Sequence, residues 1–489
     1  MSVSDRIAKA AIGFATGKAI NYIRKKPDRD LSRTVKRVLT PFRRIFPAKR
    51  IDALIKGAGD INNPYRNMLV DMALHTDKHI IKTFASVMGW DAGYRGTKAV
   101  RSNREKYKCN IPWLILIDPT SACNKRCKGC WSAEYGHKFS LSLDEMRKVI
   151  SEAKSLGTHV FMFTGGEPLI RKADIITLCE ENRDCIFLAY TNGTLIDDAF
   201  CADVRRVGNI TFALSVEGTE VSNDARRGEG SYAETMAAMR LLRSYGCLFG
   251  ISVCYTRANV DMVTSDSFLD EMIAVGVKFA LYFNYMPVGR AADKSLITTP
   301  AQREYMYHWI RRVRNAQGGK PLFTFDFQND GEYVGGCIAG GRNYFHVNSN
   351  GDMEPCVFIH FSDSNIREKT VLEALQSPLF MEYHKGQPFN NNHLRPCPML
   401  ENPDKLRGII YRTGAKPTDF IATESVEELC AKCDDFAYKW KPVADRLWAD
   451  NPHPNIYTQY YRDTDEGKRD AALKKQEEEI IRSQIKKVE

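Results

Sequence analysis

The feature that most constrains the fold of this 489-residue chain is a regular alternation of short apolar runs and helical stretches between residues 113 and 286. The runs are rich in β-branched and aromatic residues and predict strands at 113–117, 159–164, 186–191, 210–216, 249–255 and 279–286. Six consecutive βα units with right-handed crossovers form a parallel sheet, so we predict an α/β protein with a partial (β/α)6 TIM-like barrel. Reactive groups in such a barrel follow the strands, at their carboxyl ends.

The distribution of charged, apolar and cysteine residues divides the chain further. Residues 1–60 hold 15 Lys and Arg against 5 Asp and Glu, which accounts for the whole net charge of +10. We therefore predict five segments: a basic amphipathic helical region (1–108), the barrel (109–295), a helical connection (296–330), a small Cys-rich domain (331–440) and a charged helical tail (441–489). The longest strand-like apolar run, 111–117, is far shorter than the roughly 20 residues that span a bilayer, and no signal peptide is evident, so a cytoplasmic location is expected.

Three cysteines follow the first predicted strand at a spacing that indicates metal chemistry. Cys123, Cys127 and Cys130 form a C-x3-C-x2-C loop. Three thiolates on one short loop can hold three irons of a [4Fe-4S] cluster and leave the fourth iron without a protein ligand. A structural zinc site is the alternative, although it would need a fourth Cys or His nearby, and His137 is seven residues beyond the triad.

A second loop follows the second strand and reads FTGGEPL. It contains Gly165, Gly166, Glu167 and Pro168. Such a sequence is by itself a tight turn, because glycine allows unusual torsions and proline stiffens the exit. Its position after strand two places it on the same barrel rim as the cysteine loop.

Together these loops resemble the radical SAM superfamily. In that superfamily the open iron chelates S-adenosylmethionine, and an electron from a donor such as flavodoxin or ferredoxin cleaves it to a 5'-deoxyadenosyl radical. The segment TNGT, with Asn192, and the segment SVEGTEVSNDARRG at 215–228 are similar to further family motifs, with Glu217 where the family has Asp and Asn223 where it has His.

The resemblance also implies roles for single residues. Ser215 and Arg227 would contact the ribose or the methionine carboxylate of S-adenosylmethionine, and the region of Glu167 would meet its amine. The predicted cofactor-binding residues are Gly165, Gly166, Glu167, Pro168, Asn192, Ser215, Glu217 and Arg227. Gly129 stands where the family has an aromatic residue, and Trp131 is the candidate to pack on the adenine instead. The alternative for Glu217 and Arg227 is an exposed pair on a surface turn.

The C-terminal zone holds a second cysteine set. Cys337 and Cys356 form a C-x13-G-x4-C element, which resembles the opening of SPASM and Twitch domains and implies an auxiliary [4Fe-4S] cluster. Cys397, Cys430 and Cys433 would complete its ligands, and a zinc site at these three cysteines is the alternative. The other six cysteines are predicted to be buried small hydrophobic residues: Cys109, Cys179, Cys185, Cys201, Cys247 and Cys254.

These features predict a radical enzyme that takes hydrogen from an unactivated C–H bond. The basic N-terminal segment favours a membrane lipid acyl chain as substrate, for example in C–C joining of two lipid tails, with the protein bound to the inner face of an anionic membrane. In that interpretation the N-terminal helix lies in the interface and brings the barrel mouth to the acyl region. The alternatives are a helical cap that packs on the barrel, a peptide- or protein-modifying enzyme, and an RNA-binding protein, which the lack of any RNA-binding motif disfavours.

Overall fold

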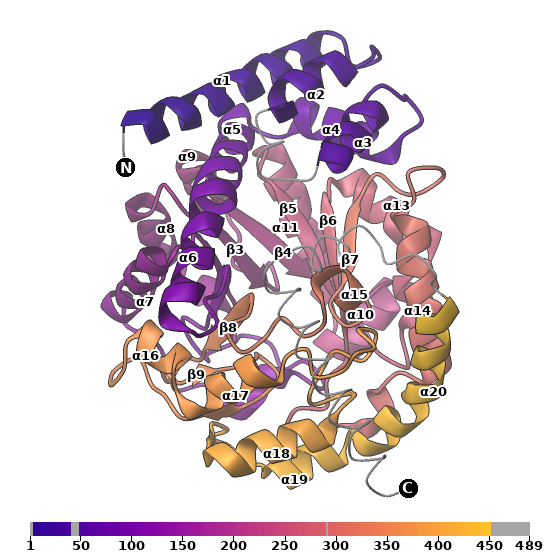
Figure 1. Ribbon diagram of the computed structural model, residues 1–489. Helices are drawn as coiled ribbons and strands as arrows, with labels where there is room; N and C mark the ends of the chain where they lie inside the picture. The colour runs from indigo at the N-terminus through magenta and orange to yellow at the C-terminus, as the bar shows by residue number, and fades with distance from the viewer. Residues whose placement is uncertain (1–2, 41–47, 290–291, 451–489) are drawn as a thin grey trace, which may run out of the picture.

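The computed structural model describes residues 3–40, 48–289 and 292–450. Its centre is a sheet with the strand order β7-β6-β5-β4-β3-β2-β1-β8-β9. Strands β1 to β8 pair in parallel, and only β9 runs antiparallel to its neighbour. The predicted partial α/β barrel is therefore confirmed (Figure 1). Its strands are β1 (Leu114–Ile117), β2 (Val160–Phe163), β3 (Ile186–Thr191), β4 (Ile210–Ser215), β5 (Phe249–Tyr255), β6 (Phe279–Asn284) and β7 (Phe323–Asp326).

Helices cover the outside of the barrel between the strands. They are α7 (Leu143–Leu156), α8 (Lys172–Glu181), α9 (Asp198–Val207), α10 (Glu220–Arg227), α11 (Ser231–Ser244), α12 (Val260–Val263), α13 (Asp266–Val275) and α14 (Pro300–Val313). Short 3-10 segments follow three of the strands: η3 (Trp131–Tyr135), η4 (Pro168–Arg171) and η5 (Lys294–Leu296). The stretch 296–330 was predicted as a helical connection, but it also contributes β7, because Phe323 and Phe325 alternate with smaller residues and pair with β6.

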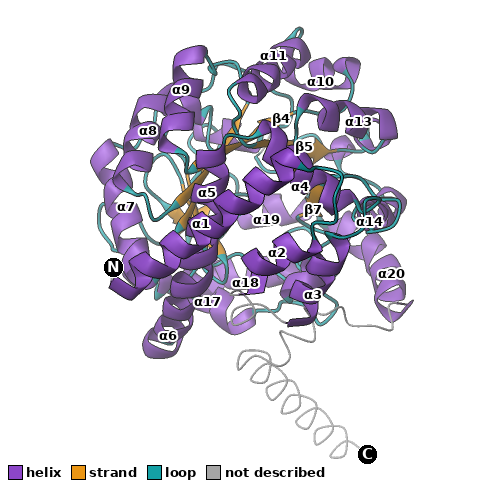
Figure 2. Ribbon diagram, turned by 90° about the horizontal axis from the view of Figure 1, so that it is seen from above, coloured by secondary structure: helices purple, strands orange, loops and turns teal. Residues whose placement is uncertain are grey.

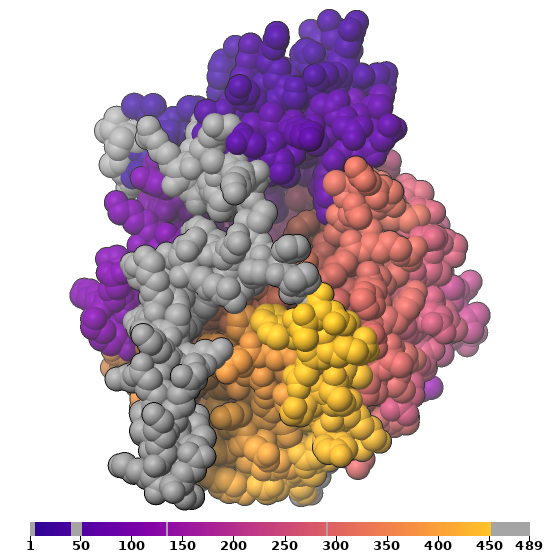
Figure 3. Space-filling model, turned by 45° about the vertical axis from the view of Figure 1, so that its right-hand side comes forward, coloured from indigo at the N-terminus to yellow at the C-terminus, as the bar shows by residue number. Residues whose placement is uncertain are grey.

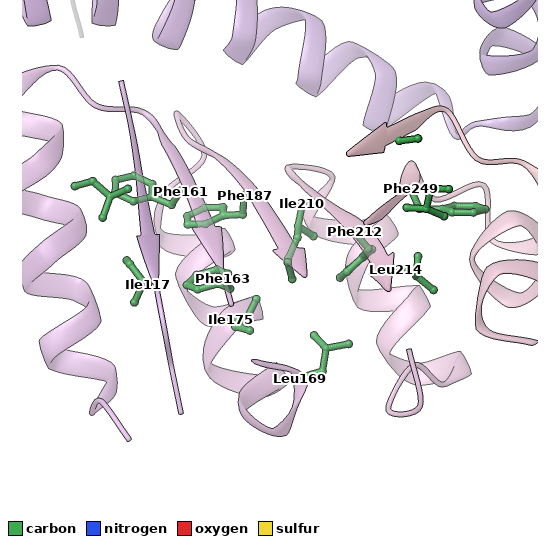
Figure 4. Close-up of a cluster of buried hydrophobic side chains, with 14 of the residues drawn as sticks. Ile117, Phe161, Phe163, Leu169, Ile175, Phe187, Ile210, Phe212, Leu214 and Phe249 are labelled. Carbon is green, nitrogen blue, oxygen red and sulfur yellow. The ribbon is translucent and has the colours of Figure 1, made fainter. Parts of the chain in front are cut away.

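The main core lies between the sheet and these helices. Successive strand side chains point to opposite faces, so Phe161, Phe163 and Phe187 face outward onto the helices (Figure 4). The rings of Phe163 and Phe187 stack with centroids 5.6 Å apart. The opposite face lines the barrel interior, where Leu188, Ala213 and Leu281 form a separate buried cluster. The interior also contains a cavity, and loops at the carboxyl ends of the strands line it.

The N-terminal residues form a helical cap at the other end of the barrel. It contains α1 (Val3–Lys25), α2 (Ser32–Leu39), α3 (Ala48–Gly57), α4 (Pro64–His75), α5 (Lys78–Ser86), the π-helical η2 (Val87–Gly96) and α6 (Thr97–Tyr107). Asp77 N donates to Gly246 O, which precedes β5, at 2.8 Å, and the Tyr65 hydroxyl donates to Arg314 O at 2.8 Å. Seen from above, α1, α4 and α5 lie over the strands (Figure 2).

This position corrects one expectation. The basic helices do not border the barrel mouth, because they pack on the amino ends of the strands, and the helical-cap alternative describes them. Among the described residues, no helix is both long and apolar enough to cross a bilayer.

The C-terminal region covers the carboxyl ends of the strands, at the bottom of Figure 1. Its elements are α15 (Gly331–Val334), β8 (Tyr344–Val347), β9 (Met353–Glu354), β10 (Phe361–Ser362), α16 (Val371–Leu375), α17 (Pro378–Gly386), α18 (Pro403–Thr413), β11 (Lys416–Pro417), α19 (Val426–Ala431) and α20 (Asp434–Asp450). It is continuous with the barrel, because β8 pairs with β1. The segment predicted as a charged helical tail, 441–489, begins inside α20, where Ala444 and Leu447 are buried; residues 451–489 lie outside the described chain.

Candidate active site

The three cysteines of the first motif lie on the loop after β1 and line one cavity at the barrel mouth. Two N–H groups approach their sulfurs: Lys125 N donates to Cys123 Sγ at 3.4 Å, and Arg227 Nη1 to Cys127 Sγ at 3.9 Å. Burial raises the pKa of Cys123 to about 11, and the charges of Cys130 and Cys127 add to this shift. Burial also raises the pKa of Cys127, and the N–H groups of Lys125 and Arg227 oppose these shifts at Cys123 and Cys127.

The GGEP loop after β2 holds the cysteine loop in place. Gly166 N donates to Thr120 O at 3.0 Å, and Glu167 N donates to Ala122 O at 2.8 Å. A Cβ on Gly166 would lie 2.2 Å from Ala122 O, so this close approach of two main chains requires glycine. The GGEP loop therefore fixes the main chain of the cysteine loop through these two hydrogen bonds.

The carboxylate of Glu167 connects the loops after β2 and β3. It is 1% exposed and accepts hydrogen bonds from Leu169 N (3.0 Å), the Thr191 hydroxyl (2.7 Å) and Asn192 N (2.8 Å). Burial raises its pKa, and these donors oppose that shift. Asn192 in turn donates to Asn124 Oδ1 in the cysteine loop at 2.8 Å.

Glu217 and Arg227 are not an exposed turn pair. Glu217 is fully buried after β4, and its carboxylate accepts hydrogen bonds from Arg227 Nε (3.0 Å) and Cys254 N (3.1 Å). Arg226 binds the same carboxylate at 2.5 Å, and Asn223 Oδ1 accepts from Glu217 N at 3.1 Å. This excludes the surface-turn alternative, because the carboxylate anchors two arginines beneath the cysteine loop.

An aromatic ring covers Gly129 from another strand. A Cβ on Gly129 would lie 2.7 Å from the ring of Tyr285, which follows β6, and Gly129 has a φ of +64°. Trp131, the expected aromatic substitute, packs edge-on against Phe358 (centroids 6.3 Å) and His360 (6.1 Å) in the C-terminal region. Tyr285 therefore fills the place beside the third cysteine.

The cavity itself has a volume of about 250 Å³ and a largely apolar wall. Of the predicted cofactor-binding residues, Gly165, Gly166, Glu167, Asn192, Ser215 and Arg227 line it, whereas Pro168 and Glu217 are buried outside its wall. Sequence reasoning missed Arg226, Asn284 and Tyr285, which also line it. Cys254 lines the cavity as well and is half-buried, which corrects its prediction as a core residue; the other five cysteines of that set are buried.

A buried ionic group fastens the end of β1 to β8 and β9. His346 Nε2 lies 2.9 Å from Asp118 Oδ1, and His346 Nδ1 lies 2.7 Å from Glu354 Oε2. Although burial opposes ionisation, the two carboxylates raise the pKa of His346 to about 10. The Tyr135 hydroxyl, just beyond the cysteine loop, donates to Glu354 at 2.7 Å. This group joins the cysteine loop to the C-terminal region.

Three of the five C-terminal cysteines gather around a second cavity of about 530 Å³: Cys337, Cys356 and Cys397. Cys397 Sγ accepts hydrogen bonds from Met399 N and Leu400 N, both at 3.4 Å. Burial, followed by the charges of Glu401, Cys337 and Cys356, raises the pKa of Cys397.

Cys430 and Cys433, on and beyond α19, are buried in the same apolar cluster but do not line this cavity. The two cavities share one wall, formed by Met286, Phe325, Phe327, Ile338, Tyr344 and Phe358.

Within the described residues, neither cysteine set holds three ligand atoms as close together as one zinc ion requires. Zn–S bonds of about 2.3 Å place the sulfurs of one tetrahedral ion about 4 Å apart. Among the described residues, the only trio of Cys, His, Asp or Glu ligand atoms within 4.8 Å of one another is His159, Asp184 and Cys185, and Asp184 is already paired with Lys154 at 2.7 Å. A [4Fe-4S] cube binds each thiolate to a different iron and so suits more widely spaced sulfurs.

Comparisons with known proteins agree with this geometry. Residues 117–267 match the family model described as the radical SAM superfamily. The chain is 27% identical over 296 residues to the AdoMet-dependent heme synthase of Methanosarcina barkeri, which covers 55% of this chain and 83% of that protein. It is 24% identical over 310 residues to the PqqA peptide cyclase of Granulibacter bethesdensis, which covers 59% and 80%.

Among solved structures, Streptococcus suis SuiB bound to S-adenosylmethionine has the same fold, with a TM-score of 0.51, 19% identity and coverage of 69% of this chain and 81% of that one. Residues 117–267 form a radical SAM domain, and the chain that carries this domain is an enzyme.

Enzymes of this superfamily use a [4Fe-4S] cluster and S-adenosylmethionine, and they need an electron donor. The residues present fit these groups. Three thiols line the cavity, two of them with an N–H donor at the sulfur, and the cationic Arg226 and Arg227 line it beside them. Arginine is the side chain best suited to bind the carboxylate of such a cofactor, because its planar fork matches two oxygens.

Proposed function

We propose that this enzyme abstracts hydrogen from an unactivated C–H bond of a predominantly apolar substrate, with a lipid acyl chain as the substrate we favour. The observation that carries the proposal is the cavity that begins at Cys123, Cys127 and Cys130 and continues over apolar side chains. The proposal includes a [4Fe-4S] cluster held by these three thiolates.

The cavity wall supports an apolar substrate. Leu116, Met162, Phe283, Phe325 and Phe327 line it, and Phe325 and Phe327 also line the second cavity. An aliphatic chain is desolvated in such a site without loss of hydrogen bonds. A polypeptide would bring main-chain N–H and C=O groups that need partners, and an apolar wall offers few.

The residues of the site hold and orient the bound cofactor. Glu217 fixes Arg227, which with Ser215 would bind the methionine carboxylate or the ribose of S-adenosylmethionine. Tyr285 offers a ring for the adenine, and Glu167 keeps Asn192 in place. When bound and reduced by one electron, the cluster and S-adenosylmethionine supply a 5'-deoxyadenosyl radical that takes a hydrogen atom from the substrate. The aromatic wall keeps water away from the resulting carbon radical.

An auxiliary [4Fe-4S] cluster is part of the proposal. Cys337, Cys356 and Cys397 around one cavity, with two main-chain N–H groups at Cys397 Sγ, suit a cluster in which hydrogen bonds to sulfur tune the potential. The remaining predicted ligands are Cys430 and Cys433. Because the two cavities share an aromatic wall, this cluster would lie within reach of a substrate radical for electron exchange.

Joining two acyl chains is the finer form of the proposed reaction. It would use two abstractions, each of which consumes one electron and one S-adenosylmethionine and yields methionine and 5'-deoxyadenosine. The two carbon radicals then form the new C–C bond, so the electrons from a flavodoxin or ferredoxin balance the reaction. The net charge of +10 in residues 1–60 supports binding to the anionic inner face of a membrane, although the described part of this segment lies at the end of the barrel remote from the cavity.

The test is isotope transfer. Reconstituted enzyme with reductant, S-adenosylmethionine and lipids carrying perdeuterated acyl chains should give deuterated 5'-deoxyadenosine, and the Phe325→Asp variant should lose the transfer. If only peptides or tetrapyrroles transfer deuterium, the substrate part of the proposal is wrong, and the relatives named as peptide cyclase and heme synthase become the better guides. Flotation of the full chain with anionic vesicles, lost on deletion of residues 1–60, tests the membrane part.

A further inference from the structure

Two buried tyrosines lie beside the second cysteine set, and the proposed reaction gives neither of them a role. Tyr344 of β8 is 2% exposed and Tyr383 of α17 is fully buried. Both belong to the C-terminal region, which forms the lower, orange and yellow part of the molecule in Figure 3, opposite the indigo cap. A buried hydroxyl normally has a hydrogen-bond partner, so the partners of these two hydroxyls indicate what the site binds.

The Tyr344 hydroxyl contacts a cysteine sulfur directly. Its oxygen lies 2.8 Å from Cys356 Sγ, and Tyr344 lines both the cavity at the barrel mouth and the second cavity. Between a thiol and a hydroxyl either group can donate, but a thiolate bound to iron carries no proton and can only accept. Tyr344 is therefore the donor when Cys356 is a cluster ligand. Burial raises the pKa of Cys356 to about 12, and the hydrogen bond from Tyr344 opposes that shift.

The Tyr383 hydroxyl has no partner, although thiols lie near it. Within residues 3–40, 48–289 and 292–450 it forms no hydrogen bond. Burial raises the pKa of this hydroxyl, and the charges of four cysteines add to the shift: Cys337, Cys356, Cys397 and Cys430. A buried donor without an acceptor destabilises the fold, so this position calls for an acceptor, which thiolate or sulfide sulfur supplies once iron is bound.

Main-chain N–H groups also approach the three sulfurs that line the second cavity. Each of these donors lies two residues beyond its cysteine: Ala339, Phe358 and Met399. Sulfur bound to iron carries negative charge and accepts such hydrogen bonds, which are one of the means by which a protein sets the potential of a cluster. The residues present therefore fit a [4Fe-4S] cluster, and the two tyrosines add side-chain donors to those of the main chain.

We propose that Tyr344 and Tyr383 donate hydrogen bonds to the auxiliary cluster, Tyr344 to Cys356 Sγ and Tyr383 to a thiolate or sulfide sulfur, and thereby raise its reduction potential. Reduction adds one negative charge to the cluster, so hydrogen bonds to its sulfurs are stronger in the reduced state. A higher potential favours electron transfer from a substrate radical to this cluster. The inference rests on the auxiliary cluster of the proposed function and on no particular substrate.

The test measures the auxiliary cluster alone in the full-length chain. The Cys123→Ala/Cys127→Ala/Cys130→Ala variant lacks the ligands of the other cluster. After anaerobic reconstitution, a redox titration followed by electron paramagnetic resonance gives the potential of the cluster that remains. Tyr344→Phe and Tyr383→Phe in this background should each lower the ratio of reduced to oxidised cluster severalfold at a fixed potential. Both changes together should lower it about tenfold, equivalent to about 59 mV for a one-electron couple.

A second measurement follows the hydroxyl protons themselves. Pulsed electron paramagnetic resonance in H2O and in D2O detects exchangeable protons that are coupled to the reduced cluster. Each of the two variants should lack one of these couplings, while the couplings of the main-chain N–H groups remain. The matched control is Tyr282→Phe, because Tyr282 of β6 is equally buried and its hydroxyl donates to Val263 O at 2.9 Å. It should change neither the potential nor the couplings.

The outcomes distinguish this inference from the proposed function. Unchanged potential and couplings in both variants, at the iron content of the parent, would overturn the inference and leave the auxiliary cluster standing. A purely structural role of the tyrosines predicts lost iron without any shift in the potential of the clusters that remain, which would also overturn it. If the parent binds no iron, the inference and the auxiliary cluster are both wrong. Should Tyr344→Phe not fold, Tyr383→Phe alone decides among these outcomes.

Discussion

At the amino ends of the strands polar groups are paired with the helical cap, whereas at the carboxyl ends they face a cavity. Asp77 binds Arg205 at 2.7 Å and the main chain of Gly246, and Lys278 forms an ion pair with Asp71 across the same interface. At the other end Cys123, Cys127, Cys130, Arg226 and Arg227 project into open volume.

The difference shows how one scaffold separates stability from chemistry. The amino end is closed by contacts between the cap and the barrel, such as Arg205 with Asp77 and Lys278 with Asp71. At the carboxyl end, Glu167, Glu217 and His346 form hydrogen bonds and ion pairs that hold the loops together. The thiols and arginines that line the cavity can contact a ligand. We therefore expect substitutions in the cavity at the carboxyl ends to alter catalysis, and substitutions at the amino ends to alter the stability of the fold.

The largest effect is expected from replacing the cysteine triad. The Cys123→Ala/Cys127→Ala/Cys130→Ala variant should form no 5'-deoxyadenosine from S-adenosylmethionine and keep a melting temperature close to that of wild type, because these thiols line a cavity and not the core. The matched control is Cys201→Ala near the amino end, fully buried, which should lose about 1 kcal/mol of stability and retain cleavage. Cleavage by the triple variant would refute the assignment.

The second prediction tests whether the two sets of cysteines bind iron independently of each other. After anaerobic reconstitution the triple variant should still bind about four irons, because the auxiliary cluster has its own ligands. Further replacement of Cys337, Cys356 and Cys397 by Ala should remove this iron. Iron and sulfide analysis measures both results, and zinc without iron in the first variant would contradict the auxiliary cluster.

A third prediction concerns the support of the carboxyl end. Arg303 of α14 and Glu401 form an ion pair in which both side chains are fully buried. Arg303→Met leaves the carboxylate without its partner and should lower the free energy of unfolding by about 3–5 kcal/mol. Denaturant unfolding measures the loss, and Arg303→Met/Glu401→Leu should recover most of it. If the double variant loses as much free energy of unfolding as Arg303→Met, the loss comes from packing and not from the unpaired charge.

The smallest effect is expected at the amino end. Lys278→Met removes the partner of Asp71 and should cost about 1–3 kcal/mol, seen as faster hydrogen exchange in α4, with cleavage of S-adenosylmethionine unchanged. Although burial opposes it, the Lys278 ammonium lowers the pKa of Asp71. The contribution of this carboxylate is therefore present above a pH of about 4 and lost as the pH falls below it. Reduced cleavage in Lys278→Met would mean that the two ends are coupled.

The sequence pattern predicted correctly those features that depend only on residues close together in the chain. The strands β3 and β5 begin and end where their β-branched and aromatic runs do, because alternation of side chains is a property of the chain itself. The cysteine spacing and the two glycines of the GGEP loop could likewise be interpreted without the fold, since a short loop brings its own residues together and a close main-chain approach excludes a side chain.

Contacts between distant segments were decided only by the tertiary structure. The Tyr285 ring over Gly129, the burial of Glu217 and the ion pair of Asp118 with His346 each join residues from different strands, and no local pattern marks them. The same holds for the place of the cap, whose basic amphipathic helices suit a membrane or a protein surface equally well by their sequence. Which face a helix buries depends on what lies opposite it, and that partner is known only once the chain has folded.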